Sequence, residues 1–250
     1  WYKYQVGINR SQAWGLIGMS KLAENGDRNR EALERLLAEI RSEMRMTRYE
    51  TGRDRLSAPV EAAMREVARH EFVPEAERPA AYANIPLPIG DGQTISQPFI
   101  VALMTEMLDL RPDAVCLEIG AGSGYQAAIL SRLAARVFTV ELRGSLAESA
   151  RERLHRLGCT NVQVLVGDGY LGWPDEAPYD AIMVTAAAPY IPPALIEQLK
   201  PGGRMMIPVG STWGRQELQL VVKTAGGETR ITDVLGVAFV PLVPGKPAED

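Results

Sequence analysis

Apolar side chains recur every three or four positions between residues 29 and 47, and Arg, Glu and Ser fill the positions between them. This spacing predicts an amphipathic helix, because it gathers the apolar side chains on one face: Leu33, Leu36, Leu37, Ile40 and Met44. A second helix is predicted over residues 59–69, and it ends before Pro74 because the residue preceding a proline favours an extended conformation. Residues 82–97 are rich in Pro, Gly and polar side chains, which predicts a loop.

Beyond this loop, helical spacing over residues 99–110 gives way to short apolar runs that alternate with helical segments. Strands are predicted at residues 114–119, 136–140, 162–166, 180–185, 204–208, 217–224 and 231–240. Helices are predicted between them through residue 133, over 145–157, and over 192–199, where Pro201-Gly202-Gly203 should stop the helix. This alternation predicts an α/β fold, a doubly wound, Rossmann-like, mostly parallel sheet with antiparallel C-terminal strands and an N-terminal helical extension.

We divide the chain of 250 residues into an N-terminal segment, residues 1–48, and a domain, residues 49–250. Residues 1–18 are aromatic-rich and irregular, and they lack the apolar stretch and cleavage pattern of a secretory signal. Met19 is a plausible initiator, so this segment is expected to be either a processed or added remainder or an arm that packs on the domain.

The composition narrows the possible chemistry. The chain has 27 basic and 31 acidic residues, a net charge of −4, and gives no reason to expect a nucleic-acid partner. No apolar run is long enough to span a membrane. With two Cys and two His, neither a Cys/His metal site nor a disulfide scaffold is expected. Any reaction must therefore use few titratable nucleophiles or bases.

A glycine-rich turn follows the first strand of the alternating region. Gly120-Ala121-Gly122-Ser123-Gly124 lets a ligand approach the backbone closely where the strand turns into a helix. The dinucleotide fingerprint would need its third glycine where Tyr125 stands, and no basic residue follows that could hold phosphates. Glu118, just before the turn, disfavours a pyrophosphate but suits a ligand with a positively charged amino group.

Two further carboxylates follow the next two strands. Glu141 ends the strand after the glycine-rich turn, where a carboxylate can accept both hydroxyl protons of a ribose. Asp168, in Gly167-Asp168-Gly169 after the third strand, can accept a hydrogen bond from the amino group of an adenine. Ligands of such sheets bind at the C-terminal ends of the strands, so these side chains should meet there. A cationic amino-acid tail, a ribose and an adenine without phosphate together describe S-adenosylmethionine.

Residues 118–124 resemble the first motif of class I methyltransferases. With six further segments, the chain resembles the protein-L-isoaspartate (D-aspartate) O-methyltransferase family over about Gly52 to Leu242. The segment 94–98, Thr-Ile-Ser-Gln-Pro, is nearly diagnostic of that family. Residues 1–48 lie outside the resemblance. The segments that carry it are 92–98, 167–170, 179–182, 185–189, 199–204 and 239–242.

The resemblance implies methyl transfer from S-adenosylmethionine to the α-carboxyl group of L-isoaspartyl residues in damaged proteins, leaving S-adenosylhomocysteine. Transfer to D-aspartyl residues is a possible further activity. The ester then cyclises to a succinimide, which reopens in part to normal aspartate. The protein's partners would be isoaspartyl-containing proteins and peptides, and we expect a cytoplasmic monomer; the composition adds that no nucleic acid, membrane or metal is expected. The implied residues are Ser96 for catalysis; Glu118, Gly120 and Gly122 for the methionine part; Glu141 for the ribose; Asp168 and Gly169 for the adenine; and Thr94, Ile95 and Val240 for the substrate.

The scarcity of His and Cys agrees with this chemistry, because a carboxylate is already ionised at neutral pH and needs no general base to attack a methyl group. Ser96 would orient that carboxylate by a hydrogen bond. Without the resemblance, a Ser in such a Pro-rich loop is more readily a turn residue. Two alternatives remain open. One is a class I methyltransferase with a different acceptor, and the other is a non-catalytic S-adenosylmethionine-binding protein in which residues 1–48 dock a partner.

Overall fold

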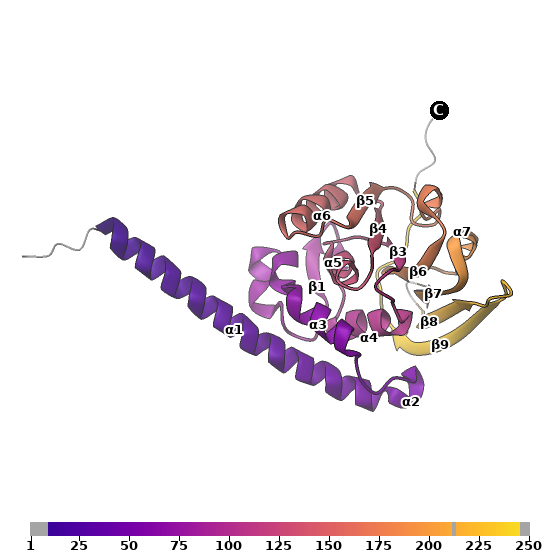
Figure 1. Ribbon diagram of the computed structural model, residues 1–250, viewed down its shortest axis with the longest axis horizontal. Helices are drawn as coiled ribbons and strands as arrows, with labels where there is room; N and C mark the ends of the chain where they lie inside the picture. The colour runs from indigo at the N-terminus through magenta and orange to yellow at the C-terminus, as the bar shows by residue number, and fades with distance from the viewer. Residues whose placement is uncertain (1–9, 212–213, 246–250) are drawn as a thin grey trace, which may run out of the picture.

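The computed structural model describes residues 10–211 and 214–245, with side chains from residue 26 onward, so expectations for residues 1–9 lie outside it. The described chain contains a seven-stranded sheet in the order β5-β4-β3-β6-β7-β8-β9 (Figure 1). Neighbours from β5 to β7 run parallel, and β8 and β9 pair antiparallel, which confirms the predicted α/β sheet. The strands are β3 (Val115–Ile119), β4 (Arg136–Glu141), β5 (Val162–Val166), β6 (Tyr179–Val184), β7 (Leu199–Gly210), β8 (Gln216–Lys223) and β9 (Thr229–Val237).

Helices cover both faces of this sheet. One face carries α4 (Pro98–Leu108), α5 (Tyr125–Ser131) and α6 (Gly144–Arg156). The other carries α7 (Pro193–Gln198) and the short η3 (Pro174–Glu176). Successive side chains of a strand point to opposite faces, so each strand supplies both cores: Cys116 and Val137 pack toward the first layer, and Leu117 and Phe138 toward the second.

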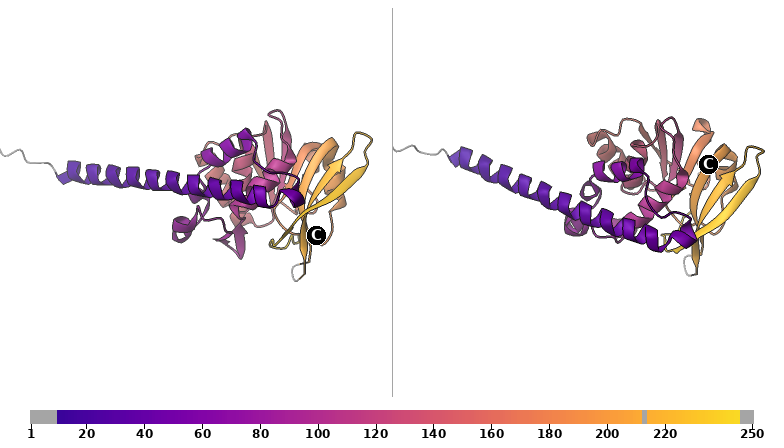
Figure 2. Two further views of the ribbon diagram at one scale, coloured as in Figure 1. Left: turned by 90° about the horizontal axis from the view of Figure 1, so that it is seen from below. Right: turned by 60° about the horizontal axis from the view of Figure 1, so that its bottom comes forward.

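The predicted amphipathic helix packs on the first layer as the C-terminal part of α1 (Arg10–Met46). Four of its five predicted apolar residues are at most 1% exposed, and Leu33 is partly buried. The predicted start at residue 29 is wrong, because the helical backbone begins at Arg10 and continues through glycines that disfavour a helix in isolation. The N-terminal half of α1 extends away from the domain (Figure 2).

Short helices connect α1 to the sheet. They are α2 (Arg48–Thr51), α3 (Ala58–Glu66), η1 (Arg69–Phe72) and η2 (Glu75–Ala80). The predicted end of the second helix at residue 69 is wrong, because Val67 is already extended and the chain re-enters a tight 3-10 turn at Arg69. This turn buries Arg69 and Phe72 against the core.

The predicted loop at residues 82–97 contains a hairpin, which corrects the sequence interpretation. Strands β1 (Leu87–Gly90) and β2 (Gln93–Ile95) pair antiparallel across Gly90-Asp91-Gly92, whose three φ angles are all positive. Strands this short are not long enough to show an alternating apolar pattern, so the Pro and Gly residues dominated the prediction. The hairpin lies beside the glycine-rich turn, where the Ile89 side chain approaches Gly122.

The strand predicted at residues 204–208 is longer than expected. β7 begins at Leu199, which pairs with Tyr179, and the register between β6 and β7 then shifts as the chain passes Pro201-Gly202-Gly203. A bulge of this kind accommodates a proline in a strand. Proline has no backbone N–H, and the regular hydrogen-bond ladder that would need one is interrupted at the register shift. The helix α7 ends at Gln198, before these three residues, which lie within the strand that follows.

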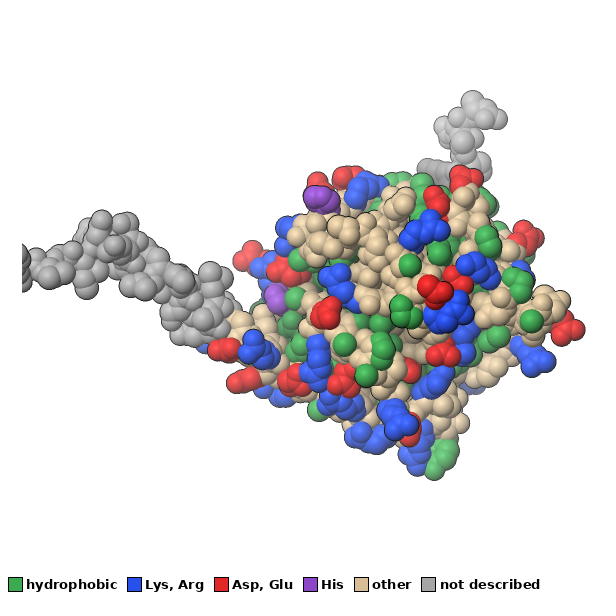
Figure 3. Space-filling view, viewed as in Figure 1, with side chains coloured by type: hydrophobic (Ala, Val, Ile, Leu, Met, Phe, Trp, Pro, Cys, Tyr) green, Lys and Arg blue, Asp and Glu red, His purple; other side chains and the backbone are tan. Residues whose placement is uncertain are grey.

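The surface shown in Figure 3 carries basic and acidic side chains interspersed, in agreement with the small net charge. Among the described residues, no helix combines the length and apolar character needed to cross a membrane. Within the same part of the chain, no three His, Cys, Asp or Glu side chains lie close enough to hold a metal ion.

We predict that the C-terminal half of α1 is part of the folded unit. Leu37 is fully buried, so Leu37→Ala should lower the free energy of unfolding by ~2–5 kcal/mol, because it leaves a cavity in the core. The exposed Glu39, two residues further along the same helix, provides the control. Glu39→Ala should change the free energy of unfolding by less than about 0.5 kcal/mol. Urea denaturation measures both, and equal values would contradict the prediction.

Candidate active site

The candidate site lies where the sheet changes its direction of growth. From β3 the chain adds β4 and then β5 on one side, and β6 then pairs with the other side of β3. The C-terminal ends of β3 and β6 therefore diverge into different connections and leave a crevice between them. Glu118 and the glycine-rich turn come from β3, and Thr185 follows β6.

Three cavities follow one another along this edge. The first, the large cleft, has a volume of about 630 Å³ and runs from Ser96 to α1 and to the chain before β8. The second, the glycine-loop cavity, measures about 40 Å³ and lies against Glu118, Gly120 and Gly122. The third, the strand-end cavity, measures about 60 Å³ and includes Glu141 and Gly169.

Shared residues join the three cavities into one series. Thr94, Ser96 and Thr185 line both the large cleft and the glycine-loop cavity. Gly120 lines both the glycine-loop cavity and the strand-end cavity. A ligand that fills both small cavities would therefore present one end to the large cleft at Ser96.

The glycine-rich turn fits closely against the end of β6. Gly120 has a φ of 95°, and a Cβ atom there would lie 2.5 Å from the Thr185 hydroxyl oxygen. That hydroxyl is within hydrogen-bonding distance of the carbonyl oxygens of Ile119 (3.0 Å) and Gly120 (2.7 Å). Any larger residue at position 120 would be strained and would displace Thr185.

Glu118 is a buried carboxylate with one unsatisfied oxygen. Its side chain is fully buried, and Oε2 accepts a hydrogen bond from the Thr139 hydroxyl at 2.5 Å. Oε1 has no hydrogen-bond partner among the described residues, although the side chain lines the glycine-loop cavity. Burial raises the pKa of Glu118 to about 8, and the neighbouring Glu141 charge contributes in the same direction. A cationic donor in this cavity would satisfy the free oxygen and favour the ionised form.

Glu141 holds the glycine-rich turn from the next strand. Its Oε2 accepts the Gly122 backbone N–H at 2.9 Å, and its Oε1 accepts the Arg143 N–H at 3.0 Å. The side chain also lines the strand-end cavity, with apolar walls from Leu142 and Val243. Each carboxylate oxygen keeps a further lone pair, so Glu141 can accept ligand hydroxyl groups while it fixes the turn.

Asp168 lies next to this cavity but does not line it. Its two oxygens accept the backbone N–H groups of Tyr170 and Gly245, both at 2.8 Å. The adjacent Gly169 does line the strand-end cavity, and a Cβ atom there would lie 2.5 Å from the Ile119 side chain. The Asp168 carboxylate, which was predicted to accept a hydrogen bond from an adenine amino group, therefore accepts one from the C-terminal segment.

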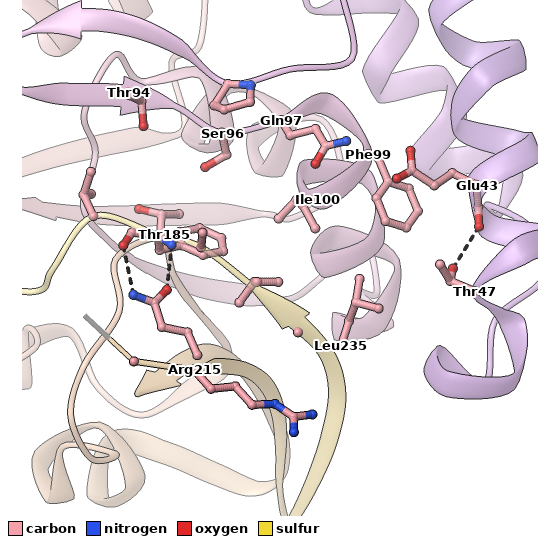
Figure 4. A pocket seen from close by; sticks show the side chains of 18 residues that line it. Glu43, Thr47, Thr94, Ser96, Gln97, Phe99, Ile100, Thr185, Arg215 and Leu235 are labelled. Atoms are coloured by element: carbon pink, nitrogen blue, oxygen red, sulfur yellow. Dashed lines mark hydrogen bonds between the residues drawn. The ribbon is translucent and has the colours of Figure 1, made fainter. Parts of the chain in front are cut away.

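The Ser96 loop is held from both sides. After β2, Pro98 opens α4, and the Asn84 side chain accepts the Phe99 N–H at 3.0 Å. The buried Arg69 donates to the Ser96 carbonyl oxygen at 2.8 Å. In Figure 4, Ser96 lies near Thr94 and Thr185, and no hydrogen bond with another described residue occupies its hydroxyl group.

The other two predicted substrate residues lie in different cavities. Val240 lines the large cleft, and its carbonyl oxygen accepts the Ala187 N–H at 2.8 Å. Ile95 lines the glycine-loop cavity and is absent from the lining of the large cleft. The structure thus brings Ser96, Thr94 and Val240 together, with Ile95 on the side of the glycine-rich turn.

Thr185, Glu43, Arg215 and Gln216 line the site but are not among the residues predicted from the sequence. Thr185 ends a predicted strand, and its position in that pattern was the available signal. Glu43, Arg215 and Gln216 gave no such signal, because their positions in the large cleft depend on how α1 and β8 pack. Gln216 fixes the chain beside Val240 by accepting the Phe239 N–H at 2.6 Å and donating to the Phe239 carbonyl at 3.2 Å, and Glu43 lies on the far wall of the cleft (Figure 4).

Comparison with known proteins agrees with the family resemblance seen in the sequence. Residues 43–247 match the family Protein-L-isoaspartate(D-aspartate) O-methyltransferase. A Polaromonas sp. protein named Protein-L-isoaspartate O-methyltransferase 2 is 55% identical over 207 residues, which cover 83% of this chain and 98% of that protein. A Methanopyrus kandleri Protein-L-isoaspartate O-methyltransferase is 52% identical over 226 residues, covering 89% of this chain and 96% of that protein.

Two solved structures share the fold. A protein-L-isoaspartate O-methyltransferase with 32% identity superposes with a TM-score of 0.70 and covers 84% of this chain and 65% of its own. A Plasmodium falciparum protein-L-isoaspartate O-methyltransferase in complex with S-adenosyl-L-homocysteine has 23% identity and a TM-score of 0.69, covering 86% of this chain and 98% of its own. At that lower identity, the likeness concerns the fold.

We predict that Glu118 makes the ligand-free protein less stable as the pH rises. Its folded pKa, about 8, lies above its ordinary value of 4.5, so the folded protein retains a proton that the unfolded chain releases between these values. Stability should therefore fall as the pH rises through this window. Glu118→Gln should remove this part of the decrease. Melting temperatures of both proteins between about pH 5 and pH 8 measure it, and parallel curves would contradict the prediction.

Proposed function

The chain belongs to the protein-L-isoaspartate (D-aspartate) O-methyltransferase family, and we propose that its cavities divide that reaction between cofactor and substrate. The enzyme transfers a methyl group from S-adenosylmethionine to the α-carboxyl group of L-isoaspartyl residues in damaged proteins and peptides. One observation carries the assignment of the site, namely that Thr94, Ser96 and Thr185 line both the large cleft and the glycine-loop cavity. Their shared border is where substrate and cofactor can meet.

The two small cavities fit the cofactor by their chemistry. The unsatisfied Oε1 atom of Glu118 can accept a hydrogen bond from the methionine ammonium group, and Gly120 and Gly122 line the same cavity. Glu141 can accept hydrogen bonds from the ribose hydroxyl groups in the strand-end cavity, and Gly169 lines the same cavity, where the adenine can bind. When bound, the cofactor supplies a methyl group on a positively charged sulfur.

The residues of the large cleft act on the acceptor. The isoaspartyl α-carboxyl group is ionised at neutral pH, so no side chain has to remove a proton before it attacks. The Ser96 hydroxyl can donate a hydrogen bond to one carboxylate oxygen and leave the other directed toward the glycine-loop cavity. Because opposite charges are neutralised as the transition state forms, alignment in a cavity that excludes water favours the transfer.

The chain around Val240 can hold the substrate backbone. The Val240 carbonyl accepts a hydrogen bond from the Ala187 N–H. The preceding residue, Phe239, is fixed by the Gln216 side chain, which bonds both its N–H and its carbonyl group. A rigid segment beside Ser96 limits how the peptide can approach, as positioning of an acceptor requires.

The remaining assignments are proposals that rest on the sequence. We propose that residues 49–250 form the methyltransferase domain and that residues 1–48 form an N-terminal segment, although Glu43 of that segment also lines the large cleft. D-aspartyl acceptors, action as a cytoplasmic monomer, and the absence of nucleic-acid and membrane partners belong to the same proposal. The net charge of −4 supports the lack of a nucleic-acid partner.

The purified protein should methylate an isoaspartyl peptide. With labelled S-adenosylmethionine, we expect a base-labile methyl ester on the isoaspartyl peptide and about one hundredth or less of that labelling on the same peptide with normal aspartate. The physical reason is that the α-carboxyl group is free only in the isoaspartyl form. Methyl transfer is fast only when that carboxylate is aligned with the methyl group. Equal labelling of both peptides would show a different acceptor, and binding of S-adenosylmethionine without any ester would show a non-catalytic protein.

Ser96→Ala should lower kcat about 10- to 100-fold, the usual effect of removing a hydrogen bond to a charged group. Affinity for S-adenosylhomocysteine should change by less than about threefold, because the side chains of Glu118 and Glu141 remain in place. Initial rates and calorimetry measure the two effects. Ser42→Ala, in α1, is the control and should leave both unchanged; an equal loss of kcat and cofactor affinity in Ser96→Ala would refute the proposed role.

A further inference from the structure

Arg69 is a fully buried cation without a carboxylate partner. Its side chain is 1% exposed, and among the described residues no Asp or Glu forms an ion pair with it. Burying an unpaired charge is costly, so a buried arginine normally has an acidic partner or a ligand. The residue is thus unusual within this core.

Three carbonyl groups and an aromatic ring surround the guanidinium group. Nε donates to the Ala81 carbonyl at 3.0 Å, and Nη2 donates to the carbonyls of Ser96 at 2.8 Å and Ile85 at 3.4 Å. The guanidinium carbon lies 5.0 Å from the centre of the Tyr125 ring. Nη1 is buried and has no hydrogen-bond partner among the described residues. These contacts satisfy part of the side chain, and none of them brings a carboxylate against the guanidinium group.

Two of these neighbours are walls of the glycine-loop cavity. Ser96 and Tyr125 both line it, so Arg69 lies directly behind that part of the wall. The cavity also contains the carboxylate of Glu118, which suits the cofactor's ammonium group. The same part of the cofactor bears a carboxylate, yet none of the described residues lining the cavity is basic. The lining therefore supplies no positive charge to this carboxylate.

We propose that Arg69 is a positioning residue whose buried charge stabilises the carboxylate of the cofactor's methionine part through the wall formed by Ser96 and Tyr125. The inference rests on the proposed function, because it assumes that the methionine part occupies the glycine-loop cavity. Arg69 does not touch the ligand, so its contribution is electrostatic and acts across a dry protein wall, where charges are weakly screened. Through the bond to its carbonyl, the same side chain fixes the Ser96 loop.

A second arginine provides a matched control. Arg153 donates to the carbonyl oxygen of Ser123, another residue of the cavity lining, at 2.7 Å. It is only partly buried, and its other guanidinium nitrogen bonds the Ser149 hydroxyl at the exposed surface of α6. Solvent screens its charge, so its removal should disturb the lining without removing an unscreened charge.

The experiment compares binding of two ligands by calorimetry, S-adenosylhomocysteine and its decarboxylated analogue, which lacks only the carboxylate. Arg69→Met should weaken S-adenosylhomocysteine at least about tenfold and the analogue by less than about threefold. Arg153→Met should change the two affinities by the same small factor. Arg69→Lys, which keeps the charge but cannot bridge three carbonyls, should retain the preference for S-adenosylhomocysteine and lower kcat with isoaspartyl peptide.

The outcomes separate this inference from the proposed function. Equal weakening of both ligands in Arg69→Met, or no weakening, would overturn the electrostatic role while the wild-type enzyme still methylates its peptide. A wild-type protein that binds neither ligand would instead overturn the proposed function. Should Arg69→Met fail to fold, Arg69→Lys decides the question, because loss of its preference for the carboxylate-bearing ligand would equally refute the inference.

Discussion

The pairing of β3 with β4 on one side and β6 on the other is the constraint on which the site depends. These strands run parallel, so their C-terminal ends meet at one edge, and the chain must leave β3 and β6 in different directions. The resulting crevice contains the glycine-rich turn, Glu141 and Thr185. Gly120 has to be glycine there because its φ is positive and Thr185 occupies the space of a side chain.

Charge burial gives this crevice its chemical character. Glu118 lies fully buried with one unsatisfied oxygen, and Arg69 lies fully buried without an acidic partner behind Ser96 and Tyr125, which line the same small cavity. Both arrangements cost stability in the free protein, and both are suited to a ligand that carries an ammonium and a carboxylate group. The raised pKa of Glu118 shows the same cost, since burial favours its neutral form until a cation binds.

The acceptor side is built by segments that precede or follow the sheet. The hairpin β1–β2 delivers Thr94 and Ser96, the end of α1 delivers Glu43, and the chains beside β8 and β9 deliver Arg215, Gln216 and Val240. Asn84 connects two of these segments, because its side chain donates to Glu43 at 2.7 Å and accepts from Phe99 at the start of α4. The cofactor cavities thus follow from the sheet, whereas the large cleft is assembled from appended elements.

The sequence by itself determined the sheet, its polarity and the order of its ligand-binding turns, because apolar periodicity and strand-end glycines are local features. It also indicated Glu118, Glu141 and Ser96, whose neighbours in the chain form recognisable motifs. Tertiary structure alone decided that Asp168 bonds to the C-terminal segment, that Pro and Gly residues before Ser96 form a hairpin, and that α1 reaches the cleft. It alone placed Arg69 behind Ser96, because that contact joins residues 27 positions apart, and burial depends on the packing of the whole domain rather than on local sequence.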